Sequence, residues 1–283
     1  MNNYVVLTGP FIGSWEQEIL TFRPYVKWLC EALDDDIDVY VSSHSNRYFL
    51  YDWIDNDKFI QVYEMLSRDE QDQFKNIHNN INNKDYALLT KNIKNSIHLN
   101  YKSKIKIKTY TPNYTVKAIS QIPTYNKIFK KIDVEKIPND YIVFIPDIKE
   151  QEDVTESIYD YLNHHYNTIV IGDTFTHLHN KNIILKLIDY FENGYTYITE
   201  YITGAKAVIC PAGHWAAIAN MQSTPVFTWG EFTGQYSNHG IYNFNNNCMT
   251  MTTDSNTKAS DIIKLVKFFI KTLEKTNNAA KSI

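Results

Sequence analysis

Short apolar strands alternate with helical segments along the 283-residue chain, and this alternation constrains the fold more than any other feature. The run Tyr4–Thr8 is rich in β-branched residues, which is typical of a buried strand, and it ends at Gly9. Residues 16–33 then carry apolar side chains at helical spacing, with Pro24 expected to kink or delay the helix. A strand at 37–41 follows, so the chain opens as a βαβ unit, which builds parallel sheets.

The same alternation returns after a polar segment, 133–140, which we interpret as a linker. Further strands are expected at 141–145, 168–171, 207–210 and 224–228. Further helices are expected at 154–162, 182–192, 216–221 and 259–273. A helix is also predicted at 57–74, and the Asn- and Lys-rich stretch 76–95 is predicted to be a loop or irregular insertion. The pattern predicts an α/β protein of two Rossmann-like domains facing across a cleft, 1–137 and 138–283, with the last helix free to pack back on the first domain.

The formal net charge of -4 hides an uneven distribution. The segment 84–131, a basic insertion of the first domain, contains eleven lysines and one acid, which indicates a polyanionic or phosphorylated partner. Within it, four lysines alternate with Ser103, Ile105 and Ile107, which predicts a strand with one basic and one apolar face. These are Lys102, Lys104, Lys106 and Lys108. They form either a solvated edge strand or a phosphate-binding surface.

Composition and spacing argue against several classes of protein. No apolar run approaches the roughly 18–20 residues that span a bilayer, and the first residues lack the basic region of a secretory signal, so we expect a soluble, cytoplasmic protein. The three cysteines are odd in number and far apart, which predicts neither a disulfide framework nor a zinc site. There is no GxxxxGK loop for ATP. The D-x-D spacing within 34–38 is interpreted as a solvated turn, and the histidines at 164–165 and 177–179 lack matching ligands, so no metal is predicted.

The loops of the second half carry the candidate ligand site. A strand followed by Gly213 and His214 and then a helix aims backbone N–H groups at one point, which suits a diphosphate. His214 either donates a hydrogen bond to a phosphate or serves only as a capping or packing residue. Two neighbouring strand ends, 172–174 and 229–231, are expected to converge beside it. The candidate donor-binding residues are Gly172, Asp173, Thr174, Gly213, His214, Trp215 and Glu231.

Residues 207–219, Ala-Val-Ile-Cys-Pro-Ala-Gly-His-Trp-Ala-Ala-Ile-Ala, are followed at 224–227 by Thr-Pro-Val-Phe. This pattern resembles the donor-site segment of GT-B glycosyltransferases, with the heptosyltransferase-like group closest in character. The resemblance covers about 172–231, with weaker support at 9–28. It implies a nucleotide-sugar donor, for which we expect a UDP-sugar, and no further cofactor. The chain departs from the pattern at Ala212, where an acid is expected, and at Ala217, where a histidine is expected, so the donor sugar cannot be carried over.

The first half adds candidate acceptor-side residues. The loop from Gly9 to Gly13 is similar to the opening loop of GT-B acceptor domains, and its glycines allow close approach of the backbone to a ligand. Inverting enzymes of this type use a carboxylate or histidine near this loop to deprotonate the acceptor hydroxyl. Glu18 and Glu16 are the candidates, ahead of His44 and Asp52. Both glutamates also fit as first-turn helix acids, and a retaining mechanism would need no such base.

These features together predict a metal-independent, nucleotide-sugar-dependent glycosyltransferase acting on a hydroxyl acceptor. The acceptor side consists of Gly9, Gly13 and the four alternating lysines. A polyanionic acceptor is expected, and hydroxymethylated pyrimidine bases in phage DNA are one concrete form of it. The alternatives are a transferase acting on a surface-glycan or lipid-linked saccharide, and a non-catalytic nucleotide-sugar-binding protein.

Overall fold

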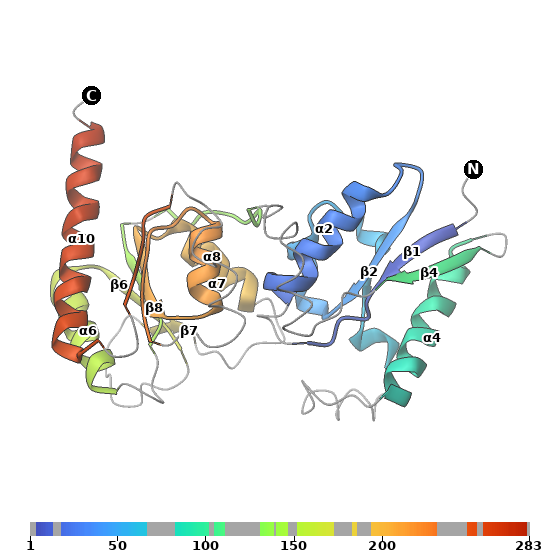
Figure 1. Cartoon of the computed structure of the whole chain (residues 1–283), viewed down its shortest axis with the longest axis horizontal. Helices are drawn as coiled ribbons and strands as arrows, with labels where there is room; N and C mark the ends of the chain where they lie inside the picture. The colour runs from blue at the N-terminus through green and yellow to red at the C-terminus, as the bar shows by residue number, and fades with distance from the viewer. Residues whose placement is uncertain are drawn as a thin grey trace. The chain divides into compact units, whose positions relative to one another are not determined.

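The chain folds into two compact units, residues 1–133 and 134–283, each built on a parallel sheet (Figure 1). A computed structural model describes residues 4–13, 18–66, 83–101, 105–110, 131–138, 140–146, 152–172, 183–185, 194–230, 248–253 and 257–281. In both units helices alternate with parallel strands, so the predicted α/β, Rossmann-like class is confirmed.

Unit 1 contains four described strands in the order β3-β2-β1-β4, all parallel. The strands are β1 (Tyr4–Thr8), β2 (Val39–Ser43), β3 (Phe59–Gln61) and β4 (Lys106–Tyr110). The helices are the π-helical turn η1 (Glu18–Phe22), α2 (Arg23–Ala32) and α4 (Asn83–Leu99). Three 3₁₀ turns complete the unit, η2 (Ser45–Tyr51), η3 (Asn56–Lys58) and η4 (Tyr63–Met65).

Helix α4 corrects the prediction that 76–95 is irregular, for the part that the structure describes. Leu89, Ile93 and Ile97 recur at four-residue spacing, and all three are buried against Val5 and Leu7 of β1. A stripe of this kind is sufficient to hold a helix against a sheet even when its other face is rich in Asn and Lys.

The predicted helix at 57–74 is wrong in its described part, 57–66. Phe59 and Ile60 are buried in β3, which pairs with Val41 and Ser42 of β2. Pairing with a neighbouring strand decides the conformation of such a short apolar run. The helix predicted at 16–33 is present from residue 18, and Pro24 lies in the first turn of α2, where a missing N–H breaks no helical hydrogen bond.

Unit 2 contains six described strands in the order β10-β9-β8-β5-β6-β7, again all parallel. They are β5 (Ile142–Phe144), β6 (Thr168–Ile171), β7 (Ile183–Leu185), β8 (Ala207–Pro211), β9 (Val226–Trp229) and β10 (Thr250–Thr252). The helices are α6 (Glu152–His165), α7 (Gly194–Gly204), α8 (His214–Met221) and α10 (Ala259–Lys281). The prediction of a helix over 182–192 is wrong at 183–185, because β7 pairs there with β6.

The two faces of the unit 2 sheet carry different helices (Figure 1). Helices α6 and α10 share a core with Phe227 and Trp229 of β9, so the helix that ends the chain packs within its own unit. Helix α8 packs on β8 and β9, and α7 packs on α8. Because side chains alternate along a strand, Thr228 points to the side opposite Phe227 and Trp229, which is the side of α8. Among the described residues, no helix is both long and apolar enough to cross a membrane.

Candidate functional site

The carboxyl ends of β8 and β9 in unit 2 leave open space beside the backbone. β8 runs through Ala212 and Gly213 into the start of α8, and β9 ends at Gly230, which has φ +97°. A Cβ atom built on either glycine would meet no atom of the described residues within 4 Å. The two strands are neighbours, with Pro211 opposite Trp229, so both glycines lie at one edge of the sheet. Ligands of open α/β sheets bind outside this edge.

Helix α8 begins at this edge with Gly213 as its N-cap, so its N-cap residue has no side-chain oxygen to cap the helix. The first N–H groups of an α-helix have no acceptor within the helix itself, and the helix dipole places positive potential at the same end. A diphosphate approaching Gly213 would therefore meet backbone donors, and the space beside Gly213 gives it room.

Two aromatic residues, His214 and Trp215, stand at the start of α8, and they differ in burial. The His214 ring lies 4.5 Å from the Trp215 ring, which stacks on Tyr195 of α7 at 6.2 Å between centroids. Trp215 and Tyr195 are buried, whereas His214 is half-buried. The Trp215 ring therefore packs α8 against α7, and His214 is the side chain that can reach a ligand. Its role in phosphate binding stays a prediction.

A buried hydroxyl lies beneath α8. Thr228 is fully buried, and its Oγ1 has no hydrogen-bond partner among the described residues. Its strand neighbour on the same side of the sheet is Cys210, whose pKa is raised by burial, so this thiol stays neutral and serves packing. An unpaired buried hydroxyl is unusual and indicates a group left to be satisfied by something else.

The other predicted donor loop is only partly described. Gly172 follows β6, and a Cβ on it would come within 3.3 Å of the Pro146 side chain, so this glycine allows two strand ends to pack closely. Asp173, Thr174 and Glu231 lie outside the described residues.

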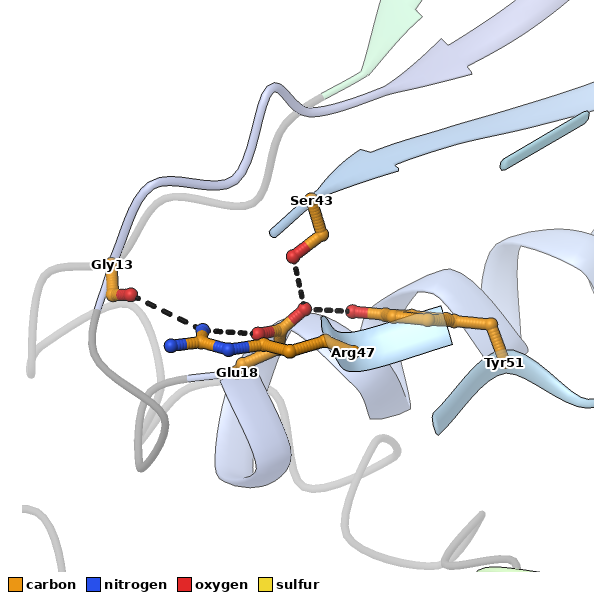
Figure 2. Close-up of polar contacts among 5 residues, drawn as sticks. All are labelled: Gly13, Glu18, Ser43, Arg47 and Tyr51. Atoms are coloured by element: carbon orange, nitrogen blue, oxygen red, sulfur yellow. Dashed lines mark hydrogen bonds and ion pairs between the residues drawn. The ribbon is translucent and has the colours of Figure 1, made fainter. Parts of the chain in front are cut away.

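The carboxyl edge of the unit 1 sheet holds a buried charge cluster around Glu18 (Figure 2). The Glu18 carboxylate accepts hydrogen bonds from the Ser43 hydroxyl, from the Arg47 guanidinium and from the Tyr51 hydroxyl, the last at 2.7 Å. Arg47 also donates to the Gly13 carbonyl at 3.4 Å. Both Glu18 and Arg47 are buried away from water, so each charge is stabilised by the other and not by solvation.

This cluster gives Glu18 partners that sequence reasoning missed. Ser43 ends β2, and Arg47 and Tyr51 lie on the turn η2 that directly follows it. The available signal was the polar run after a strand end, since that is where parallel sheets gather functional groups. Glu16 lies outside the described residues. The assignment of either glutamate as a catalytic base stays a prediction.

The remaining acceptor-loop candidates have structural contacts. Gly9 has φ +99°, and a Cβ there would lie 2.5 Å from the Ser42 carbonyl oxygen, so only glycine fits. His44 meets Phe11 edge-on, with ring centroids 6.5 Å apart, and Asp52 is exposed after η2.

The predicted lysine strand is present as β4, in the part that is described. Lys106 is exposed, the Lys108 ammonium lies 3.3 Å from the centroid of the Tyr4 ring, and Ile107 packs toward the α4 side. β4 lies at the end of the described strand order, beside β1. Lys102 and Lys104 lie outside the described residues. The alternation of a basic and an apolar face is confirmed, and phosphate binding by the basic face stays a prediction.

The acidic turn predicted at 34–38 has Asp34, Asp35 and Asp36 exposed. Asp38 instead forms an ion pair with Lys58 at 2.8 Å and accepts a hydrogen bond from Tyr101 at 2.8 Å. Within the described ranges, no three His, Cys, Asp or Glu side chains form a group that could hold a metal ion.

Comparison with known proteins found similar solved structures but no similar sequence. No protein-family model matches the chain, and no curated protein matches it by sequence. The chain is similar to the solved structure of the glycosyl transferase family 9 from Veillonella parvula DSM 2008, with a TM-score of 0.53 and 11% identity over 95% of this chain and 98% of that one. A second similar structure, E. coli heptosyltransferase WaaC with ADP, has a TM-score of 0.42 and 12% identity over 95% of this chain and 99% of that one. The first likeness shows that the chain has the α/β fold of that glycosyltransferase structure.

Proposed function

We propose that this chain is a glycosyltransferase that uses a nucleotide-sugar donor. Unit 2 would bind the donor diphosphate at the start of α8, and unit 1 would bind the acceptor. The observation that carries the proposal is the space beside Gly213 and Gly230 in the described part of the chain, at neighbouring strand ends and next to a helix start whose N-cap is a glycine. The likeness of the fold to a family 9 glycosyltransferase over nearly the whole chain supports the same reaction class.

The reaction would move the sugar from one oxygen to another. The bond between the anomeric carbon and the diphosphate oxygen breaks, and a bond to the acceptor oxygen forms while that hydroxyl loses its proton. The departing diphosphate gains negative charge, which the N–H groups at the start of α8 stabilise and to which His214 donates. We propose that these groups, without a metal ion, supply the positive potential.

Proton removal from the acceptor is assigned, within this proposal, to Glu18. Its carboxylate is fully buried and already accepts three hydrogen bonds, so the residues around it must move before an acceptor hydroxyl can reach it. The same burial favours a second candidate function, a nucleotide-sugar-binding protein without turnover. In that case Glu18 only holds Arg47 and the loop at Gly13 in place.

The acceptor is proposed to be anionic, because β4 presents Lys106 and Lys108 on one face. Hydroxymethylated DNA and a phosphorylated, lipid-linked saccharide both have the required charge. No observation on the described residues favours the DNA acceptor.

The proposal is tested first by donor binding. Titration with UDP, ADP and GDP, each free and sugar-linked, should show saturable binding to the wild-type chain. Gly213→Val fills the open space, and we expect it to weaken binding at least about tenfold, which corresponds to about 1.4 kcal/mol. His214→Ala should weaken binding by a smaller factor, because it removes one donor. His164→Ala is the matched control, since His164 is exposed near the end of α6, on the other face of the sheet.

Turnover separates the two candidate functions. Labelled nucleotide sugars would be incubated with hydroxymethylated DNA, plain DNA and phosphorylated saccharides. Transfer to any of these acceptors by the wild-type chain supports the enzyme, and its loss in Glu18→Gln assigns the proton transfer to Glu18 where the variant stays folded, as circular dichroism would show, and keeps its donor affinity. Donor binding without transfer to any acceptor supports the binding protein, and failure of every nucleotide to bind refutes both.

A further inference from the structure

Helix α10 carries an exposed basic stripe with a phenylalanine at its centre. The stripe consists of Lys264, Lys267, Phe268, Lys271 and Lys275, and all five side chains are exposed. Their spacings of three, four, seven and eleven residues place them on one face of the helix. Phe268 is 59% exposed, although a large apolar side chain gains free energy by leaving water.

The stripe lies opposite the face with which α10 joins the core. The core-facing side chains are Ile262, Val266, Phe269, Ile270 and Leu273, all of them buried. The apolar face of the helix is therefore already used, and Phe268 is not needed to fold unit 2. Among the described residues, two stripe lysines contact residues beside the stripe. The Lys264 ammonium lies 2.9 Å from the Asp261 carboxylate, and the Lys267 ammonium lies 4.8 Å from the centroid of the Tyr161 ring.

The charge pattern of the stripe is not that of an ordinary solvated face. Lys267, Lys271 and Lys275 follow one another at four-residue spacing, where like charges destabilise a helix. A solvated helix face usually mixes both signs. The bordering acid Glu274 lies toward Lys206, 4.0 Å away, and Asp261 compensates only Lys264. A net positive surface thus persists on a chain whose formal net charge is -4.

We propose that the α10 basic stripe docks this protein on the surface of an anionic phospholipid bilayer. The negative surface potential of such a bilayer attracts lysines, and an exposed phenylalanine inserts at the boundary between headgroups and acyl chains. A nucleic acid would also attract the lysines, but phosphate contacts give no reason to expose an apolar ring among them. The proposal stands independently of the proposed sugar transfer.

The position of α10 in unit 2 is compatible with docking. α10 and α6 cover one face of the sheet, and α8 lies on the other face (Figure 1). A bilayer against the exposed side of α10 would therefore leave the face that carries α8 uncovered.

The experiment is co-sedimentation of the full chain with vesicles, without any nucleotide sugar. Phosphatidylcholine vesicles would be compared with vesicles that also contain phosphatidylglycerol, at low and at high salt. The double variant Lys271→Glu/Lys275→Glu should lose at least about tenfold in partitioning to the anionic vesicles. Phe268→Ser should lose several-fold without changing the charge. Lys27→Glu/Lys136→Glu is the matched control, because neither lysine lies on α10 or in the basic segment 84–131, and the change in charge is identical.

The control should stay within about twofold of wild type, since only lysines facing the bilayer contribute. Equal binding to both kinds of vesicle, or no binding to the anionic ones at low salt, would overturn the proposal. So would a loss in the control that matches the loss in the α10 double variant. Binding that Phe268→Ser leaves unchanged, together with equally tight capture of duplex DNA, would identify a polyanion surface in place of a bilayer surface.

Discussion

The carboxyl edges of the two sheets differ in what occupies them. In unit 1 the edge is filled: a Cβ on Gly9 would strike the Ser42 carbonyl, and the Glu18 carboxylate is enclosed by three donors. In unit 2 the edge is open as far as the structure describes it, because no described atom lies within 4 Å of a Cβ built on Gly213 or Gly230. Glycine thus serves close backbone packing in one sheet and access to the backbone in the other.

This difference suggests a division of labour between the units. An open backbone at a helix start recognises a phosphate group whatever is attached to it, and no side chain has to move. A fully buried carboxylate such as Glu18 cannot contact a substrate until the residues that cover it move. Under the proposed function, unit 2 is ready for its ligand, whereas the Glu18 cluster of unit 1 first has to rearrange.

The largest predicted loss of stability comes from removing the Glu18 charge at the filled edge of unit 1. Glu18→Gln leaves the Arg47 charge buried without a counter-charge, so we expect the free energy of unfolding to fall by about 3 kcal/mol. Urea unfolding measures the loss. Glu31→Gln is the control, because its pair with Lys27 is half-exposed and should contribute less than about 1 kcal/mol. Equal losses in the two variants would show that the Glu18 cluster does not hold unit 1 together.

The next effect tests the two kinds of glycine directly. Gly9→Ala places a methyl group 2.5 Å from the Ser42 oxygen at φ +99°, so we expect a loss of about 2–3 kcal/mol in unfolding free energy. Gly213→Ala meets open space in extended backbone and should change stability by only about 0.5 kcal/mol, the difference between glycine and alanine at an N-cap. Thermal and urea unfolding of the two variants compare them. A destabilised Gly213→Ala variant would mean that the edge of unit 2 is also filled.

A smaller change in stability is predicted for Thr228, the buried threonine at the edge of unit 2. Thr228→Val replaces a buried hydroxyl without a partner by a methyl group of similar shape, so we expect stability to rise by up to about 1 kcal/mol. If the hydroxyl binds the donor, nucleotide affinity should fall at the same time. Urea unfolding and nucleotide titration on one preparation give both values. Thr224→Val is the control with the opposite sign, because the Thr224 hydroxyl donates to the Ile202 carbonyl at 2.9 Å.

Local sequence was sufficient for the open edge and insufficient for the filled one. The strand, Gly213 and the start of α8 are neighbours in the chain, so strand periodicity followed by a glycine and a helix pattern predicts them. The Glu18 cluster joins residues 25, 29 and 33 positions apart. The cluster forms because η2, which follows β2, brings Arg47 and Tyr51 next to Glu18 at the edge of the sheet. No local sequence pattern predicts this contact between separate parts of the chain.

The misassigned elements follow the same rule. β3 is a strand because β2 offers it hydrogen bonds, whereas its short apolar run by itself does not distinguish strand from helix. In α4 the polar composition concealed the buried stripe at Leu89, Ile93 and Ile97, since Asn and Lys on the outer face dominate the average. Burial against the sheet, which composition does not record, decided both elements.

The smallest predicted effect contrasts the buried pair with an exposed one at the opposite edge of the unit 1 sheet. Asp38 precedes β2 and has its pKa lowered, chiefly by the hydrogen bond from Lys58 and also by that from Tyr101, although burial opposes the shift. A lowered folded-state pKa adds stability that is present above the unfolded value of about 4 and is lost as pH falls through the folded value. The Asp38 and Lys58 side chains are 40% and 26% exposed, so solvent screening limits the contribution to about 0.5 kcal/mol. Asp38→Asn should therefore destabilise the protein slightly at pH 7 and less at pH 3, because the stability from a lowered pKa declines below the unfolded value, as measured by urea unfolding at both pH values. A difference as large at pH 3 as at pH 7 would assign the effect to hydrogen-bond geometry, since a contribution from the charge of Asp38 declines over this range.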